Sequence, residues 1–300
     1  MSATLDLNGL PVSFVDRGAG RPILFLHGAT QDRSVWTRQL AHFRHTHRVL
    51  AYDMRGHGDT PLGEAIQSGR DVLTVDRLAD DCIDFIDALG LERPVLCGVS
   101  LGGMVALQVA ARAPDRVGAF VLANTPIALS LNSTVLRIID ALNPYAVLVP
   151  LLRYVEPMRV ARIGTRCARI VFGPGWARGE GTERFIAAFG RMSPKALIET
   201  YRAICEVRLP DLTGIDRVPT LVVTGEDEAG MIFRHAAEIA RMVGTAELAT
   251  IPGGHVSNLD SPREFNRALA AFFERWLETD QMSGPSRRMA SATSGSIRPS

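Results

Sequence analysis

The chain has 300 residues, of which 46% are hydrophobic and 22% charged, a balance typical of globular proteins that bury a large core. Its formal net charge of +1 gives no electrostatic reason to expect nucleic-acid or membrane binding. The N-terminal stretch MSATLDLNGLP lacks the pattern of a signal peptide, and no stretch reaches the ~20 apolar residues of a membrane span, so we expect a cytoplasmic protein.

Strand-like and helix-like segments alternate along most of the chain. Dense apolar runs that end in polar residues are typical of strands buried on both faces of a parallel sheet, whereas apolar residues spaced three and four apart indicate helices. The predicted strands, in chain order, are 10–16, 22–28, 47–53, 93–100, 117–125, 219–227 and 246–253. The predicted helices are 75–89, 101–113, 233–243 and 263–277. Repeated strand–helix units imply an α/β fold, a mostly parallel sheet with helices on both faces.

Residues 126–210 interrupt this alternation. The stretch has a helical pattern with Gly and Pro interruptions, and it carries 12 basic and 6 acidic residues. We therefore interpret it as a helical cap inserted into an α/β core formed by residues 1–125 and 211–278. Residues 279–300 are rich in Ser, Gly, Arg and Pro with little to bury, so we expect a disordered tail.

One segment of this cap is strongly basic. Arg159, Arg162, Arg166 and Arg169 are spaced three, four and three residues apart, so all four lie on one face of a helix. A solvated charged face is the simpler interpretation, and attraction of a carboxylate-bearing substrate is the alternative. The glycine-rich stretch 173–181 lacks the spacing of a phosphate loop and follows no clear strand, so we assign it to a cap loop.

The stretch 97–104, CGVSLGGM, contains the strongest chemical motif of the chain. Ser100 lies at the junction of a predicted strand and a predicted helix. So sharp a turn strains the backbone and leaves room only for glycine two positions to either side, at Gly98 and Gly102. The hydroxyl then projects alone at the helix N-terminus, which is the nucleophile-elbow arrangement. The alternative is a glycine-rich turn whose serine only caps the helix.

A serine hydroxyl needs a base to act as a nucleophile, and His255 is the candidate. It follows the last predicted strand, so it should reach the sheet edge that carries Ser100, where open α/β sheets bind ligands. The other histidines are not expected to act in catalysis or in a metal site; they include His57, in a turn after a strand, and the loop residues His42, His45 and His47.

The tetrahedral intermediate of acyl transfer needs N–H donors for its oxyanion. The backbone N–H of Leu101, at the start of the helix, is one candidate. The backbone N–H of Ala29 is the other, because it lies in the loop after strand 22–28 and Gly28 would let that backbone come close.

Six segments occur in the order found in the α/β-hydrolase superfamily: LHGAT, YDMRGHGDT, GVSLGGMVALQVAARAPDRV, VLANT, VVTGEDE and PGGHVSNLDSP. The chain resembles this superfamily nearly throughout, outside the cap and tail, and residues 100–125 are similar to the 3-oxoadipate enol-lactonase branch. The resemblance implies an eight-stranded sheet, a helical cap after the sixth strand, and a Ser, acid, His triad in that chain order. It assigns Ser100 as nucleophile, His255 as base, and Leu101 and Ala29 as oxyanion donors.

The triad acid departs from the family pattern, which is G-x-x-D after the seventh strand. Here the segment is Gly225-Glu226-Asp227-Glu228-Ala229, so Glu228 occupies the expected place and Asp227 is one residue earlier. A glutamate can orient and stabilise an imidazolium as an aspartate does, if the backbone accommodates one more methylene. Three interpretations stay open: Glu228 is the acid, Asp227 is the acid, or neither is.

These observations predict a serine hydrolase that cleaves a small, mostly apolar ester, lactone or thioester through an acyl-enzyme, without metal or cofactor. The expected partner is a small-molecule substrate, with no nucleic acid and no membrane. One alternative is a carbon–carbon bond hydrolase of the meta-cleavage type, which uses the same Ser and His. Another is a ligand receptor or biosynthetic cyclase that keeps the elbow without hydrolytic turnover.

Overall fold

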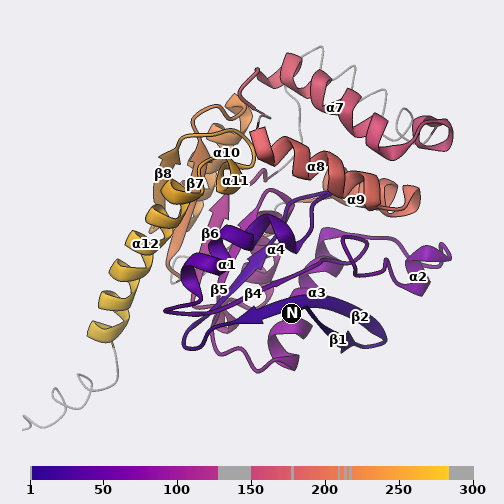
Figure 1. The fold of residues 1–300 in the computed structure, drawn as a ribbon. Coiled ribbons are helices and arrows are strands. Elements are labelled where there is room, and N and C mark those ends of the chain that lie inside the picture. Colours follow the sequence, from indigo (N-terminus) through magenta and orange to yellow (C-terminus); the bar gives the residue numbers. More distant parts are fainter. Residues whose placement is uncertain are drawn as a thin grey trace, which may run out of the picture.

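The computed structural model describes residues 2–127, 150–176, 179–208, 210–212, 215 and 218–283. Within these residues the chain forms one eight-stranded sheet with the order β1-β2-β4-β3-β5-β6-β7-β8 (Figure 1). The strands are β1 Ala3–Leu7, β2 Leu10–Arg17, β3 Pro22–Leu26, β4 Arg48–Tyr52, β5 Val95–Val99, β6 Ala119–Ala123, β7 Thr220–Gly225 and β8 Glu247–Ile251. β2 is antiparallel to both β1 and β4, and the neighbouring pairs from β4 to β8 are parallel. The predicted sheet is therefore confirmed.

The central strands of the sheet consist mainly of apolar residues, which suits strands that helices cover on both faces. β3, β5, β6 and β7 are buried at every residue, as expected of strands covered on both faces. The outer strand β8 alternates between more and less exposed residues. At the other edge, the β1–β2 turn uses Asn8 and Gly9 with φ of 54° and 84°. Positive φ at both central residues is what a type I′ hairpin turn requires, and Asn-Gly supplies it with little strain.

Helices cover both faces of the sheet (Figure 1). The core helices are α1 Thr37–Phe43, α2 Glu64–Gln67, α3 Val75–Ala88, α4 Leu101–Arg112, α10 Gly230–Val243, α11 Ser257–Asp260 and α12 Pro262–Ser283, with 3₁₀ turns at Arg33–Trp36 and Pro114–Arg116. α3, α4 and α10 contribute to one apolar core. On the opposite face, α1 and α12 pack with Trp36, Phe265 and Phe272 in a second core.

Three described helices of the insertion lie over the end of the sheet where the parallel strands finish (Figure 1). They are α7 Pro157–Phe172, α8 Gly179–Arg191 and α9 Pro194–Glu206. Polar contacts join this cap to the core. The buried carboxylate of Glu199 in α9 accepts from the backbone N–H of Leu73 at 3.1 Å, and Arg191 in α8 pairs with Asp32. The cap is thus held over the sheet by charged groups as well as by apolar packing.

Two observed helix ends differ from the predicted ones by three residues or more. α10 begins at Gly230 rather than at residue 233. α12 continues to Ser283, so residues 279–283 are helical rather than part of a disordered tail. The sequence explains the second difference, because no Gly or Pro interrupts the helix before the Gly284-Pro285 pair. The rest of the predicted tail, 284–300, lies outside the described residues.

Candidate active site

Ser100 lies in the sharp turn between β5 and α4. Its φ of 52° and ψ of −114° are unusual for a residue with a side chain, and this conformation directs the hydroxyl away from the sheet. A Cβ at Gly98 would lie 2.3 Å from the carbonyl carbon of Gly102, so strand and helix meet there as predicted. A Cβ at Gly102 would lie 2.1 Å from the carbonyl oxygen of Leu26, which adds a contact with β3 that the motif did not reveal.

His255 reaches Ser100 from the loop after β8. Its Nε2 lies 3.0 Å from the Ser100 Oγ, although the two residues are 155 positions apart in the chain. The loop's backbone is held by Asn124, which follows β6 and donates to the carbonyl oxygen of His255 at 3.0 Å. The same side chain accepts from the backbone N–H of Gly225 at the end of β7. Asn124 therefore ties three strand ends together around the imidazole.

The carboxylate beside His255 belongs to Glu228. Its Oε2 lies 2.8 Å from the imidazole Nδ1, and its Oε1 accepts from the backbone N–H of Ala229 at 2.8 Å. The Glu228 side chain is completely shielded from solvent. Asp227 is exposed, and its side chain lies against the backbone at Gly175 in the cap. The structure therefore brings Glu228, and not Asp227, into contact with the imidazole.

Opposing effects act on the pKa of His255. Burial disfavours the protonated ring and lowers the pKa. The Glu228 carboxylate, by its charge and its hydrogen bond, and the more distant charge of Asp260 act in the opposite direction. Their sum raises the pKa of His255 above its ordinary 6.5. The Glu228 carboxylate thus favours the protonated form of the ring.

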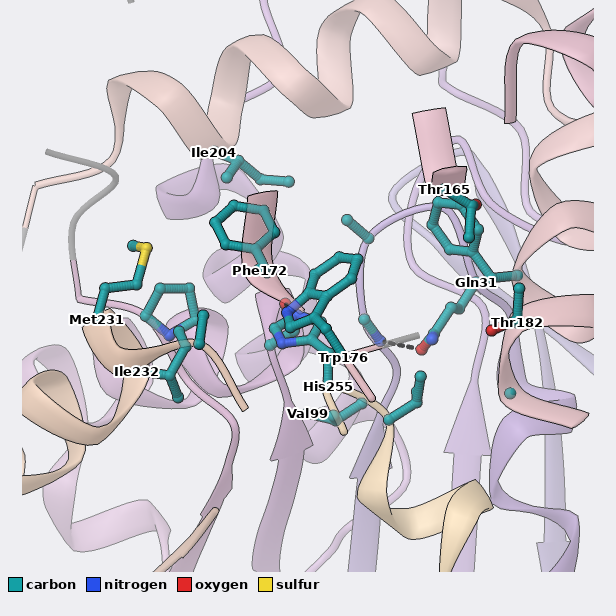
Figure 2. A pocket seen from close by; sticks show the side chains of 18 of the residues that line it. Gln31, Val99, Thr165, Phe172, Trp176, Thr182, Ile204, Met231, Ile232 and His255 are labelled. Carbon is teal, nitrogen blue, oxygen red and sulfur yellow. Dashed lines mark hydrogen bonds between the residues drawn. The ribbon is translucent and has the colours of Figure 1, made fainter. Parts of the chain in front are cut away.

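The two predicted oxyanion donors flank Ser100. Leu101 is the first residue of α4, and Ala29 lines the same cavity as Ser100. Among the described residues, neither backbone N–H donates to a protein acceptor. The loop with Ala29 is held from both sides of Gly28, whose N–H donates to Gln31 Oε1 at 3.0 Å and whose carbonyl lies 2.8 Å from His27 Nδ1. Figure 2 shows Gln31 at the cavity wall.

His27 supports this loop as a neutral ring. Its burial lowers its pKa to about 4, so the ring is uncharged near pH 7. Its Nε2 accepts from the backbone N–H of Met54 at 2.9 Å, which leaves Nδ1 as the donor to the Gly28 carbonyl. No pattern in the sequence pointed to His27, Gln31, Asn124 or Trp176. The segments LHGAT and VLANT contained two of them but gave no sign of what their side chains contact.

A cavity of about 300 Å³ opens beside Ser100 and His255, between core and cap (Figure 2). Its larger apolar lining residues are Phe172, Trp176, Phe185, Ile204, Met231 and Ile232. Its uncharged polar groups come from Gln31, Thr165, Thr182 and Tyr201. Within the described lining no Lys, Arg, Asp or Glu side chain occurs. The cavity suits an uncharged, mostly apolar group next to the hydroxyl.

The basic face of α7 does not line the cavity beside Ser100. Arg159, Arg162, Arg166 and Arg169 are all exposed, and α7 contributes Thr165 and Phe172 to the cavity instead. This placement favours the solvated face over attraction of a substrate carboxylate. His57 is buried, as expected of a structural residue, and burial lowers its pKa to about 3. In the described part of the chain, no group of three His, Cys, Asp or Glu side chains could hold a metal ion.

The doubly covered parallel sheet, the elbow serine and the capped cavity together define an α/β hydrolase. The alpha/beta hydrolase family matches residues 23–268, and the chain belongs to this family. It is 25% identical over 282 residues to 3-oxoadipate enol-lactonase 2 of Acinetobacter baylyi, covering 91% of this chain and 97% of the relative. The similarity to the enol-lactonase branch is therefore confirmed.

Solved structures of other hydrolases share the fold. The enol-lactonase from Burkholderia xenovorans LB400 superposes with a TM-score of 0.74 at 21% identity, covering 91% of this chain and all of that one. Est816, described as an N-acyl homoserine lactone degrading enzyme, has a TM-score of 0.67 at 26% identity and covers 90% of this chain and all of its own. The protein is thus a hydrolase by family. No helix among the described residues is long and apolar enough to cross a membrane.

Proposed function

We propose that the protein is a serine hydrolase that cleaves a small, mostly apolar ester or lactone, or a thioester, through an acyl-enzyme. The observation that carries the proposal is the continuous hydrogen-bonded chain of Ser100, His255 and Glu228 at the wall of an apolar cavity. Such a chain activates a hydroxyl for attack on a carbonyl, because the base is already within reach of the proton. The lactonase names of the similar proteins support the choice of lactones and esters.

The first half of the reaction acylates Ser100. Its Oγ attacks the substrate carbonyl carbon while Nε2 of His255 accepts the hydroxyl proton. Glu228 holds the Nδ1–H of the ring and stabilises the resulting imidazolium. The carbonyl oxygen becomes an oxyanion that the backbone N–H groups of Leu101 and Ala29 stabilise. As the tetrahedral intermediate collapses, His255 returns the proton to the leaving alcohol.

The second half hydrolyses the acyl-enzyme. Water enters the position of the alcohol, His255 removes one of its protons, and the hydroxide oxygen attacks the acyl carbon. The second tetrahedral intermediate then releases the carboxylic acid and re-forms the Ser100 hydroxyl with the proton from His255. For a lactone the two products are one molecule, because the alcohol and the acid belong to the same opened ring.

Turnover of p-nitrophenyl acetate and butyrate tests this proposal. We expect Ser100→Ala to fold normally and to lose at least ~10³-fold in kcat, because the triad acts as a unit. A fluorophosphonate should label Ser100 in the wild-type protein, as located by mass spectrometry, and should not label the Ala variant. A wild-type protein that neither turns over the esters nor reacts with the fluorophosphonate would be a receptor or a non-hydrolytic catalyst instead.

The lining of the cavity limits the substrate further. Apolar side chains and uncharged polar groups surround the position next to Ser100 in the described residues. Burying a carboxylate there would cost several kcal/mol without a paired cation. We therefore expect neutral lactones and short acyl esters to have a higher kcat/KM than analogues with a carboxylate on the acyl part. A preference for the charged analogues would contradict this substrate class.

A further inference from the structure

We propose that Trp176, in the cap loop between α7 and α8, is a positioning residue that holds the His255 imidazole in its hydrogen-bonded orientation and stabilises its protonated form. The proposal rests on the proposed function for the role of His255 as the base. It adds a cap residue to the proposed triad and oxyanion donors, which all belong to the core.

The indole lies on the face of the imidazole. The two ring centroids are 5.0 Å apart and the ring planes differ by 22°, so the rings stack (Figure 2). An indole is the best aromatic partner for a cation within about 6 Å of its centroid. When His255 accepts the serine proton, its positive charge forms directly against this surface. The stack is also unfavourable to ring rotation, which would move Nε2 away from Ser100.

Main-chain contacts fix the same two segments to each other. The backbone N–H of His255 donates to the carbonyl oxygen of Trp176 at 2.9 Å. A Cβ at Gly254 would lie 2.4 Å from the carbonyl oxygens of both Gly175 and Trp176, so only glycine permits this approach. Gly175 in turn lies against Asp227, next to the acid residue. The cap loop therefore contacts both turns that carry the base and its carboxylate.

The indole is itself held in place. Phe172, at the end of α7, packs on Trp176 with ring centroids 5.1 Å apart. The edges of the imidazole are occupied by Glu228 at Nδ1 and Ser100 at Nε2. Among the described residues, the other charged group that acts on the ring is Asp260 in α11, and it favours protonation as Glu228 does. Trp176 therefore contacts one face of the imidazole, which the two hydrogen bonds at the ring nitrogens leave uncovered.

A fluorescence titration tests the contact without any substrate. Protonated imidazole quenches an indole that it touches, and the chain has three tryptophans. We expect the wild-type emission to fall as pH decreases through the pKa of His255. This transition should be absent in His255→Gln and in Trp176→Phe. Its persistence in both variants would assign it to another tryptophan and would contradict the stack in solution.

Two substitutions of Trp176 then test whether His255 needs an aromatic ring at this position or only an apolar side chain. Trp176→Leu keeps an apolar side chain but removes the ring, and Trp176→Phe keeps a ring. We expect the pKa of His255, followed by NMR of its ring C–H groups, to fall by roughly 0.5 unit in the Leu variant and less in the Phe variant. With p-nitrophenyl acetate, kcat should fall about tenfold in the Leu variant and KM should change little, because a misaligned base slows the chemical step. The Phe variant should recover most of this loss.

Phe185→Leu is the matched control, because Phe185 lines the same cavity but its ring contacts that of Phe189 in a tilted arrangement rather than the imidazole of His255. It should alter KM without shifting the pKa. An unchanged pKa and kcat in Trp176→Leu, or an equal pKa shift in Phe185→Leu, would overturn the proposal. If the titration depends on Trp176 but no ester is turned over, the proposed function fails and with it the catalytic role. If esters are turned over and Trp176→Leu behaves as wild type, only the positioning role fails.

Discussion

Glu228 and Asp227 are adjacent in one turn, yet their carboxylates have different surroundings. The turn is fixed by backbone hydrogen bonds, from Asp227 N–H to the carbonyl of Gly253 and from Glu228 N–H to that of Gly225. These bonds direct the Glu228 side chain toward the imidazole and leave the Asp227 side chain exposed. The extra methylene of glutamate is accommodated because Ala229, and not proline, follows and offers its N–H to the same carboxylate.

Glu228→Gln should therefore lower kcat about 10²-fold or more, because the amide cannot stabilise the imidazolium and can favour the wrong tautomer. Asp227→Asn is the matched control and should cost about 10-fold or less. Glu228→Asp should keep partial activity, because the charge survives at shorter reach. These constants are measured on one ester under saturating conditions. If Asp227→Asn were the more damaging change, the assignment of the acid would move one residue back.

The pH dependence of kcat/KM follows from the same contact. As the proposed base, His255 must be neutral to accept the serine proton, and despite burial the Glu228 carboxylate raises its pKa above 6.5. Activity should therefore increase as pH rises through that raised pKa and level off above it. Initial rates at low substrate concentration, measured between pH 5 and 9, give this rise of kcat/KM with pH. A flat profile across this range would exclude His255 as a general base.

At the scale of elements, the position of Ser100 depends on how closely α4 approaches β5 and β3. A methyl group at Gly98 or Gly102 would meet backbone atoms at 2.3 and 2.1 Å, and backbone cannot move aside as a flexible side chain can. A methyl group at Gly103 would overlap the side chain of Thr125. Each glycine of the motif is thus required by a different neighbour, because a side chain at that position would overlap it. The neighbours are the backbone of Gly102, the backbone of Leu26 and the side chain of Thr125.

Gly102→Ala should destabilise the fold by about 1–3 kcal/mol or more, because strand and helix must separate. For a domain of this size the melting temperature should fall by roughly 2–4 °C per kcal/mol. Gly164→Ala in α7 is the control, because a Cβ there has no neighbour within 4 Å and the helix gains by up to about 1 kcal/mol. Thermal unfolding followed by circular dichroism compares the two. Equal melting temperatures would contradict the close contact.

At the scale of the whole molecule, the sequence predicted local features well and distant contacts poorly. Buried strands and the Ser100 turn could be predicted because apolar runs and glycine spacing are local properties. The bond from Asn124 to the His255 carbonyl spans 131 positions, and the Trp176 stack joins cap to core. Such contacts depend on how the sheet and the cap pack together, so no local pattern of apolar residues predicts them. The sequence limited the candidates for the carboxylate beside His255 to Glu228 and Asp227. The geometry of their turn then shows which of the two contacts the imidazole.

The attachment of the cap provides a test at this largest scale. Glu199 in α9 is 2% exposed, and its carboxylate accepts from the Leu73 N–H of the core. Lys195 and Arg202, from the same helix, neutralise this carboxylate. α9 also contributes Tyr201 and Ile204 to the cavity. A weaker attachment of this helix should therefore alter substrate binding without touching the reacting groups of the core.

Glu199→Gln should cost about 1–2 kcal/mol of stability, because it weakens the core contact and leaves two partly exposed cations without their acid. KM for p-nitrophenyl butyrate should rise severalfold while kcat changes little, since the proposed triad lies entirely in the core. Glu156→Gln is the control, because Glu156 is exposed and its ion pair among the described residues is a loose one, with Arg159 at 3.9 Å. Its melting temperature and KM should match the wild type. If Glu199→Gln also matched the wild type, the cap would be held by its apolar contacts alone, and the buried carboxylate would have no part in shaping the cavity.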